Sequence, residues 1–111
     1  MIYKLLETVE WESAREVGEF RGSAVDLADG YIHFSDAGQV VETARRYFDG
    51  RRGLTLLGVD EATLGDALRW EPSRGGALFP HLYAPLPVGA VLTAVALDED
   101  LPVADAVSAA L

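Results

Sequence analysis

The sequence predicts a single α+β domain in which helices are segregated from a mainly antiparallel sheet. The expected segments follow the order strand, helix, strand, helix and then mainly strands. At 111 residues, half of them hydrophobic, the chain has the size and apolar content of one domain with a full core. No internal repeat or domain boundary is visible, so we expect one domain over residues 1–111, with a core over about residues 1–97 and a tail over residues 98–111.

The first segments are expected to be a strand and a helix. Ile2–Leu6 is rich in branched and aromatic residues and contains no breaker, as is typical of a strand. A helix is expected to begin at Thr8 as its N-cap, because apolar residues then recur at helical spacing until Gly18. Glu19–Asp29 contains an adjacent glycine and serine and is expected to be a loop, and a strand follows at Tyr31–Phe34.

The second helix has the clearest pattern. Val40–Phe48 carries apolar residues on one face, and Asp36 with Gln39 resembles a capping box before it. In the preceding strand, alternation turns His33 away from the apolar face. His33 is therefore expected just before a helix N-terminus, where free backbone N–H groups and a partial positive charge favour an anionic ligand.

The second half of the chain is expected to consist mainly of strands. The segments are strands at Leu54–Val59, Ala67–Glu71 and Val91–Leu97, with one helical turn at Glu61–Leu64. Phe79–Pro87 contains three prolines, which fix the backbone and lack the N–H donor, so this segment is not expected in the middle of a sheet. The Ala-rich end of the tail is expected to be a frayed helix.

Composition excludes several classes of function. The net charge of −9 repels a phosphate backbone, so we expect no nucleic-acid partner. No apolar run approaches ~18 residues and no secretory signal precedes the first strand, so we expect neither a membrane partner nor export. The absence of cysteine excludes disulfides and thiolate chemistry, and we expect a cytoplasmic location.

The basic residues are unevenly distributed. Six of the nine fall in one stretch, at Arg45, Arg46, Arg51, Arg52, Arg69 and Arg74. This distribution allows two interpretations of the Arg45–Arg52 patch. It is either a solvated helix end with its following loop, or a small surface that contacts an anionic ligand.

The two histidines of the chain sit in similar settings. His33 and His81 each lie among aromatic and apolar residues beside a glycine or proline turn signal. Each can act as a general acid or base near neutral pH, or can order a turn by hydrogen bonding. Glu71 could complete a two-histidine, one-carboxylate metal site, but the spacing matches no metal motif and we expect no metal. We interpret the two histidine segments as two walls of one pocket.

Aromatic residues are expected to supply more of this pocket. Tyr83 lies two residues after His81, so on extended backbone both side chains point the same way. Tyr3 and Tyr31 add aromatic surface, and an aromatic cleft with a few polar groups suits a nucleobase or a nicotinamide. An ordinary edge of the core has the same composition.

Four segments together resemble a small bacterial family known as domain of unknown function 952. They are Ile2–Lys4, Asp29–Ser35, Arg69–Glu71 and Phe79–Pro87, and the resemblance extends over about residues 1–97. The resemblance implies a fold similar to that of the ADP-ribosyltransferases. Such a fold has mainly antiparallel sheets in two halves, two main helices packed against them, and NAD in a cleft between two small sheets.

The resemblance also implies roles for individual residues. Lys4 falls where the superfamily usually has a histidine or arginine that grips the NAD ribose, His33 falls at the second catalytic position, and His81 falls where a glutamate is usual. The expected catalytic residues are His33, His81 and Glu71. The expected ligand contacts are Lys4, Tyr3, Ser35, Tyr83 and Arg69.

We therefore expect a small-molecule ligand, NAD or a related nucleotide, bound by a monomer or weak homodimer. The implied reaction class is transfer or hydrolysis at the glycosidic bond. A neutral imidazole at His81 supplies no negative charge where a glutamate is usual. The alternative is therefore a non-catalytic binding or protein-interaction module that keeps the fold.

Overall fold

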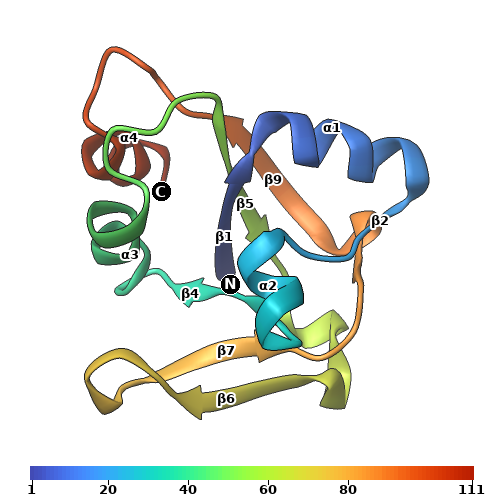
Figure 1. Ribbon diagram of the computed structural model, residues 1–111. Coiled ribbons are helices and arrows are strands. Elements are labelled where there is room, and N and C mark those ends of the chain that lie inside the picture. Colours follow the sequence, from blue (N-terminus) through green and yellow to red (C-terminus); the bar gives the residue numbers. More distant parts are fainter.

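The computed structural model describes residues 1–111 and contains three antiparallel sheets and four α-helices (Figure 1). The strands are β1 (Ile2–Glu7), β2 (Glu19–Phe20), β3 (Ile32–His33), β4 (Ser35–Asp36), β5 (Leu54–Val59), β6 (Leu68–Pro72), β7 (Leu78–Leu82), β8 (Leu86–Pro87) and β9 (Val91–Ala96). The helices are α1 (Thr8–Val17), α2 (Ala24–Asp29), α3 (Val40–Tyr47) and α4 (Val103–Ala110), with short 3₁₀ turns between several strands. The predicted class, α+β with antiparallel sheets, is confirmed.

The largest sheet has the strand order β4-β1-β5-β9. Its two central strands pair over six positions, from Ile2 opposite Val59 to Glu7 opposite Leu54. α1 lies on one side of these strands, and α3 and α4 lie on the other (Figure 1). Because both faces are covered, every residue of β5 is buried, and its sequence reads as an almost continuous apolar run.

Strand alternation divides the core into two clusters on opposite faces of this sheet. Leu6 and Leu57 pack with α1 and the smaller sheets, whereas Leu5 and Leu56 pack with α3 and α4. The C-terminal segment, expected to be a frayed helix, is thus an ordered part of the second cluster. Val107 of α4 is fully buried there, since α4 packs directly on α3.

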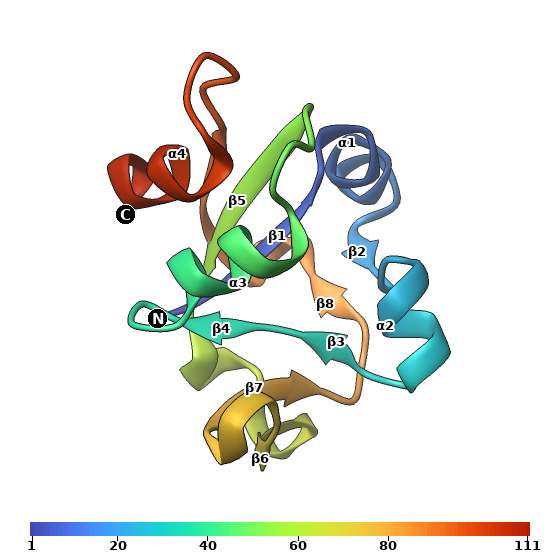
Figure 2. The same ribbon diagram turned by 60° about the vertical axis from the view of Figure 1, so that its left-hand side comes forward.

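The expectation that Phe79–Pro87 stays out of the middle of a sheet is wrong. β7 is the central strand of a second sheet with the order β3-β7-β6. The N and C=O groups of one antiparallel residue point to the same side, and the Pro80 carbonyl accepts the Phe34 N–H at 3.0 Å. The missing donor of Pro80 therefore faces the junction of β3 and β4, which lie end to end (Figure 2). Pairing with β6 is uninterrupted.

Residues 19–29, expected to be a loop, form β2 and α2. α2 is preceded by Ser23, whose backbone N–H donates to the Asp26 carboxylate at 2.8 Å in a capping box. It ends at Gly30, whose left-handed backbone, with φ of 87°, closes the last turn. At six residues the helix is too short to show the periodic apolar pattern by which longer helices are recognised.

The N-cap of α1 and the placement of a helix N-terminus just after His33 also differ from the prediction. The N-cap of α1 is Glu7, while the Thr8 hydroxyl shares a 2.7 Å hydrogen bond with the Thr55 hydroxyl of β5. α3 begins at Val40, only after β4 and a turn, because the chain extends past His33 to pair with β1. The expectation of a helix N-terminus directly after His33 is therefore wrong. No helix N–H groups follow His33 to favour an anionic ligand there.

Candidate functional site

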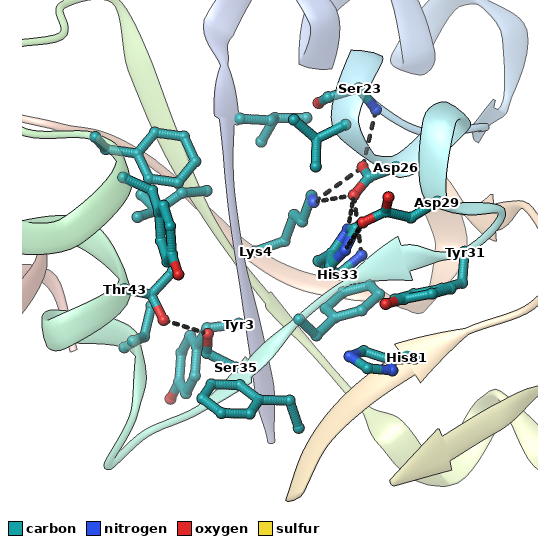
Figure 3. A pocket seen from close by; sticks show the side chains of 18 of the residues that line it. Tyr3, Lys4, Ser23, Asp26, Asp29, Tyr31, His33, Ser35, Thr43 and His81 are labelled. Atoms are coloured by element: carbon teal, nitrogen blue, oxygen red, sulfur yellow. Dashed lines mark hydrogen bonds and ion pairs between the residues drawn. The ribbon is translucent and has the colours of Figure 1, made fainter. Parts of the chain in front are cut away.

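A cleft of about 870 Å³ opens between α2, α3 and the two larger sheets (Figure 3). Ligand pockets typically have volumes of about 300–1,000 Å³, so the cleft is large enough for a nucleotide-sized molecule. Its wall is rich in aromatic side chains. These are Tyr3, Tyr31, Phe34, Tyr47, Phe48 and Phe79.

The small sheet explains why both histidines reach this region. His33 on β3 lies opposite His81 on β7, and His81 lies opposite Arg69 on β6. Directly opposed residues share one face of a sheet, so these side chains form a polar row. Ile32 and Leu82, which point to the other face, are buried in the first core cluster. The sheet thus separates a polar face from the core.

A buried ion pair crosses the wall of the cleft from β1 to α2. Lys4 is 7% exposed, and its Nζ lies 3.0 Å from Oδ1 and 2.9 Å from Oδ2 of Asp26, which is 2% exposed. Burial lowers the pKa of Lys4, and the charge and hydrogen bond of Asp26 offset this only in part. Two charges taken out of water are tolerated here because each compensates the other.

Asp26 also attaches α2 to β3. Its Oδ1 accepts from the backbone N–H of His33 at 3.0 Å and lies 2.6 Å from the ring Nδ1 of His33. Burial alone would raise the pKa of Asp26, but the His33 ring, the Lys4 charge and the backbone N–H groups of His33 and Ser23 outweigh it and hold the pKa at about 2. Asp26 is therefore ionised at neutral pH.

We expect this carboxylate to make the protein acid-sensitive. A pKa lowered from 3.8 to about 2 contributes stability that is fully present above pH 4 and is lost as the pH falls towards 2. At 1.36 kcal/mol per pKa unit the loss is about 2 kcal/mol. Denaturant unfolding at stepped pH measures it, and a carboxyl-carbon NMR titration assigns it to Asp26. A midpoint near the ordinary 3.8 for Asp26 would contradict the expectation.

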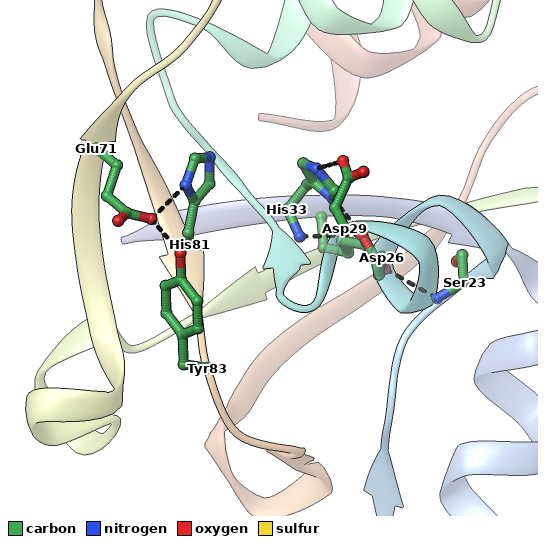
Figure 4. Close-up of polar contacts among 8 residues, drawn as sticks. Ser23, Asp26, Asp29, His33, Glu71, His81 and Tyr83 are labelled. Atoms are coloured by element: carbon green, nitrogen blue, oxygen red, sulfur yellow. Dashed lines mark hydrogen bonds and ion pairs between the residues drawn. The ribbon is translucent and has the colours of Figure 1, made fainter.

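Both ring nitrogens of His33 face carboxylates. Nδ1 lies against Asp26, and Nε2 lies 2.9 Å from Oδ2 of Asp29, which follows one turn of α2 later (Figure 4). Because Asp26 is ionised and can only accept, Nδ1 carries a proton. While these two contacts hold, His33 presents no free lone pair to the cleft. Its position suits the organisation of the wall better than proton transfer.

His81 has the opposite arrangement. It is 3% exposed, and its Nδ1 lies 2.8 Å from Oε1 of Glu71, which also accepts the Tyr83 hydroxyl at 2.7 Å (Figure 4). Hydrogen bonds from Tyr83 and His81 lower the pKa of Glu71, and the same carboxylate raises the pKa of Tyr83. An ionised Glu71 fixes the proton of neutral His81 on Nδ1, which leaves the Nε2 lone pair free at the cleft.

Tyr31 joins the two histidines into one aromatic cluster. Its ring centroid lies 4.6 Å from that of His33, 4.1 Å from that of His81 and 5.3 Å from that of Tyr83. Burial and the nearby carboxylates, Asp29 first among them, raise the pKa of Tyr31, so its hydroxyl keeps its proton at neutral pH. The cluster provides a stacking surface beside the free nitrogen of His81.

The structure brings together only some of the residues predicted for the site. Those that line the cleft are Tyr3, Lys4, His33, Ser35 and His81. Glu71, Arg69 and Tyr83 lie outside its lining, behind His81, where the Arg69 guanidinium covers the Tyr83 ring at 4.8 Å. Ser35 is buried and shares a 3.0 Å hydrogen bond with Thr43, so its hydroxyl is already used within the protein.

The arginines of the Arg45–Arg52 patch are paired with carboxylates. The pairs are Arg45–Glu42, Arg46–Glu42, Arg51–Glu7 and Arg52–Glu99. Only Arg51 of these four lines the cleft. This geometry agrees with the interpretation of the patch as a solvated helix end and loop.

The sequence reasoning missed Asp26 and Asp29. A signal was present, because Ser23 is followed three residues later by Asp26, and Gly30 suits the end of a short helix. The partner of Asp26 could not be found in this way. Lys4 lies 22 residues earlier on a separate strand, and no local pattern connects the two.

The fold and the cleft together define a small α+β protein with a histidine-bearing cleft between antiparallel sheets. The chain belongs to the family of proteins of unknown function DUF952, whose pattern matches residues 5–94. It is similar to the crystal structure of protein CC0527 from Caulobacter crescentus, with a TM-score of 0.88 and 49% identity over 96% of this chain and 97% of that chain. The solution NMR structure of CC0527 gives a TM-score of 0.80 and 51% identity, over 92% and 90% of the two chains. No curated protein matches the sequence.

No group of three or more histidine and carboxylate side chains is arranged to hold a metal ion. None of the helices has the length and apolar character needed to cross a membrane.

Proposed function

We propose that the protein binds NAD or a related nucleotide in this cleft, within a fold of the ADP-ribosyltransferase type. His81 then moves a proton during transfer or hydrolysis at the glycosidic bond. The observation that carries the proposal is the His81 side chain, whose Nδ1 is held by Glu71 while Nε2 stays free in an aromatic cleft. A carboxylate–imidazole pair of this kind is the common arrangement of a general base.

Glu71 supplies a negative charge next to the His81 imidazole, which carries none itself. An ionised carboxylate 2.8 Å from Nδ1 stabilises the imidazolium that forms when Nε2 accepts a proton. Glu71 does not line the cleft, so its role is to position and support His81. His33 lies beside His81 on the same face of the sheet, and Asp26 holds both His33 and Lys4 in place.

In the hydrolytic step, water is the nucleophile, nicotinamide is the leaving group and His81 is the proton acceptor. A water oxygen attacks C1′ of the ribose that carries nicotinamide, the C1′–N bond breaks, and the electron pair of that bond leaves with nicotinamide. The proton of the water passes to Nε2 of His81. The imidazolium later returns this proton to solvent.

We expect saturable binding of NAD, measured by calorimetric titration alongside ADP-ribose and nicotinamide. Tyr31→Leu removes the central ring of the aromatic cluster, and stacking of this kind is worth roughly 10-fold or more in affinity. The matched control is Trp70→Leu. Trp70 is 40% exposed on the other face of β6, outside the cleft, and its loss should leave affinity unchanged.

Two outcomes would count against the nucleotide proposal. One is the absence of heat from all three ligands with a folded protein. The other is an equal loss of affinity in the Tyr31→Leu and Trp70→Leu variants, which would show a general loss of structure. The variant His33→Ala is unsuited to this test, since it also removes a hydrogen bond from buried Asp26.

A binding module without turnover is the second candidate. The observation that favours it is the engagement of Lys4 and His33 within the protein, which leaves His81 as the one proton-transfer group with a free nitrogen. Binding of NAD without nicotinamide release by the wild-type protein would decide for this candidate.

A further inference from the structure

One cation in the cleft differs from the others in having no carboxylate partner. The cleft is lined by three basic side chains, Lys4, Arg51 and Arg74. Lys4 is paired with Asp26 and Arg51 with Glu7, but no carboxylate lies within 4.0 Å of Arg74. In a chain with 18 acidic and nine basic residues, an unpaired guanidinium is an exception. Arg69 is the other such residue, and it lies outside the cleft.

Arg74 is held in place by contacts that leave its donors free. It belongs to the 3₁₀ turn Arg74–Gly76 between β6 and β7. Its guanidinium lies 4.9 Å from the ring centroid of Phe79 and 5.9 Å from that of Tyr47, and it donates one hydrogen bond, of 3.4 Å, to the Thr43 hydroxyl. A guanidinium has five N–H donors in a rigid fork, so most of them are available to a ligand.

The location of Arg74 gives the cleft two different ends. Thr43, which Arg74 contacts, lies on the α3 side of the cleft, and the cluster of Tyr31, His33 and His81 lies on the other (Figure 3). A half-buried, pre-oriented guanidinium matches the geometry of a phosphate, which it binds through two parallel hydrogen bonds. A ligand that reaches from His81 to Arg74 would therefore carry its anionic group at the α3 end.

We propose that Arg74 binds a phosphate of the ligand, so that the cleft selects phosphorylated nucleosides over free nucleosides and bases. This inference rests on the proposed nucleotide function and adds the residue that recognises the phosphate. The aromatic rings of Phe79 and Tyr47 act as positioning groups for the guanidinium.

The test is a cycle of two ligands and two proteins, measured by calorimetry. The ligands are nicotinamide mononucleotide and nicotinamide riboside, which differ by the phosphate alone. The wild-type protein should bind the mononucleotide roughly 10- to 100-fold more tightly, the usual effect of a charge-assisted contact. Arg74→Gln should remove this preference while leaving riboside affinity within about 3-fold. Arg69→Gln, an identical change of charge outside the cleft, is the control and should keep the preference.

The outcomes separate the inference from the function on which it rests. Equal binding of the two ligands by the wild-type protein, or an equal effect of Arg69→Gln, would overturn the role of Arg74 while leaving nucleotide binding intact. If neither ligand binds, the titration with NAD decides about the proposed function, and a titration with inorganic pyrophosphate decides about Arg74. A saturable shift of the Arg74 Nε–H NMR signal, which is identified by its disappearance in Arg74→Gln, supports an anion site. A signal that does not move excludes one.

Discussion

Replacement of Asp26 by Asn is expected to lower the free energy of unfolding by about 3–5 kcal/mol. The cause is Lys4, which is 7% exposed and has Asp26 as its only ion-pair partner. An amide cannot neutralise that buried charge. Since domains of this size are stable by about 5–15 kcal/mol, the variant would lose a large part of its total stability.

Removal of the cation of this pair should cost less stability than removal of the carboxylate. Lys4→Met removes the buried cation, while Asp26 keeps its hydrogen bonds from Ser23 and from the backbone and ring of His33. In the double variant, which combines Lys4→Met with Asp26→Asn, neither charge of the pair remains. Its loss of stability, measured by urea denaturation followed by circular dichroism, should therefore be smaller than the sum of the two single losses.

The Glu42–Arg45 pair on α3 provides the matched control. Its N–O distance is 2.7 Å, shorter than that of the Lys4–Asp26 pair, but its side chains are 44% and 58% exposed. Glu42→Gln and Arg45→Met should each change stability by less than about 1 kcal/mol. Strict additivity at Lys4 and Asp26, or equal costs at the two pairs, would show that burial is not the source of the effect.

The elements that could be predicted are those with a long, unambiguous pattern. α1 and the body of α3 were predicted from apolar residues at helical spacing, and β1, β5 and β9 were predicted from runs of branched, aromatic or apolar residues without a breaker. The errors of prediction lie in segments whose structure depends on their length or on contacts with other segments. α2 is too short for a periodic signal, and β7 accepts Pro80 because its missing donor points to a junction between strands. α4 is ordered by packing on α3, which its own Ala-rich sequence does not reveal.

The site was predicted in the same uneven way. The convergence of His33 and His81 on one pocket was predicted, because each lies among aromatic residues beside a turn signal. Their pairing in register was not predicted, because the segment of His81 was expected outside the middle of a sheet. The difference between them could not be seen. It depends on Asp26 and Asp29, which occupy both nitrogens of His33, and on Glu71, which occupies one nitrogen of His81. These partners come from other elements, so that only tertiary structure assigns the free nitrogen to His81.

Replacement of His81 by Gln is expected to slow nicotinamide release from NAD by roughly 100- to 10,000-fold, the usual contribution of a general base. The glutamine removes the free Nε2, which is the proton acceptor in the proposed step. Single-turnover assays of released nicotinamide measure the rate, and calorimetry measures NAD affinity. A structural role alone would change stability and affinity together and would not produce a selective loss of rate.

Glu71→Gln provides the sharper test of the same pair. It keeps the size of the side chain and removes the negative charge that stabilises an imidazolium at His81, so we expect a rate loss of at least roughly 10-fold. Because Glu71 does not line the cleft, NAD affinity should stay within about 3-fold. Tyr83→Phe removes only one hydrogen bond to Glu71 and should have a smaller effect on the rate. A wild-type rate in both His81→Gln and Glu71→Gln would exclude the pair from the chemistry, because no other imidazole in the cleft has a free nitrogen to replace it.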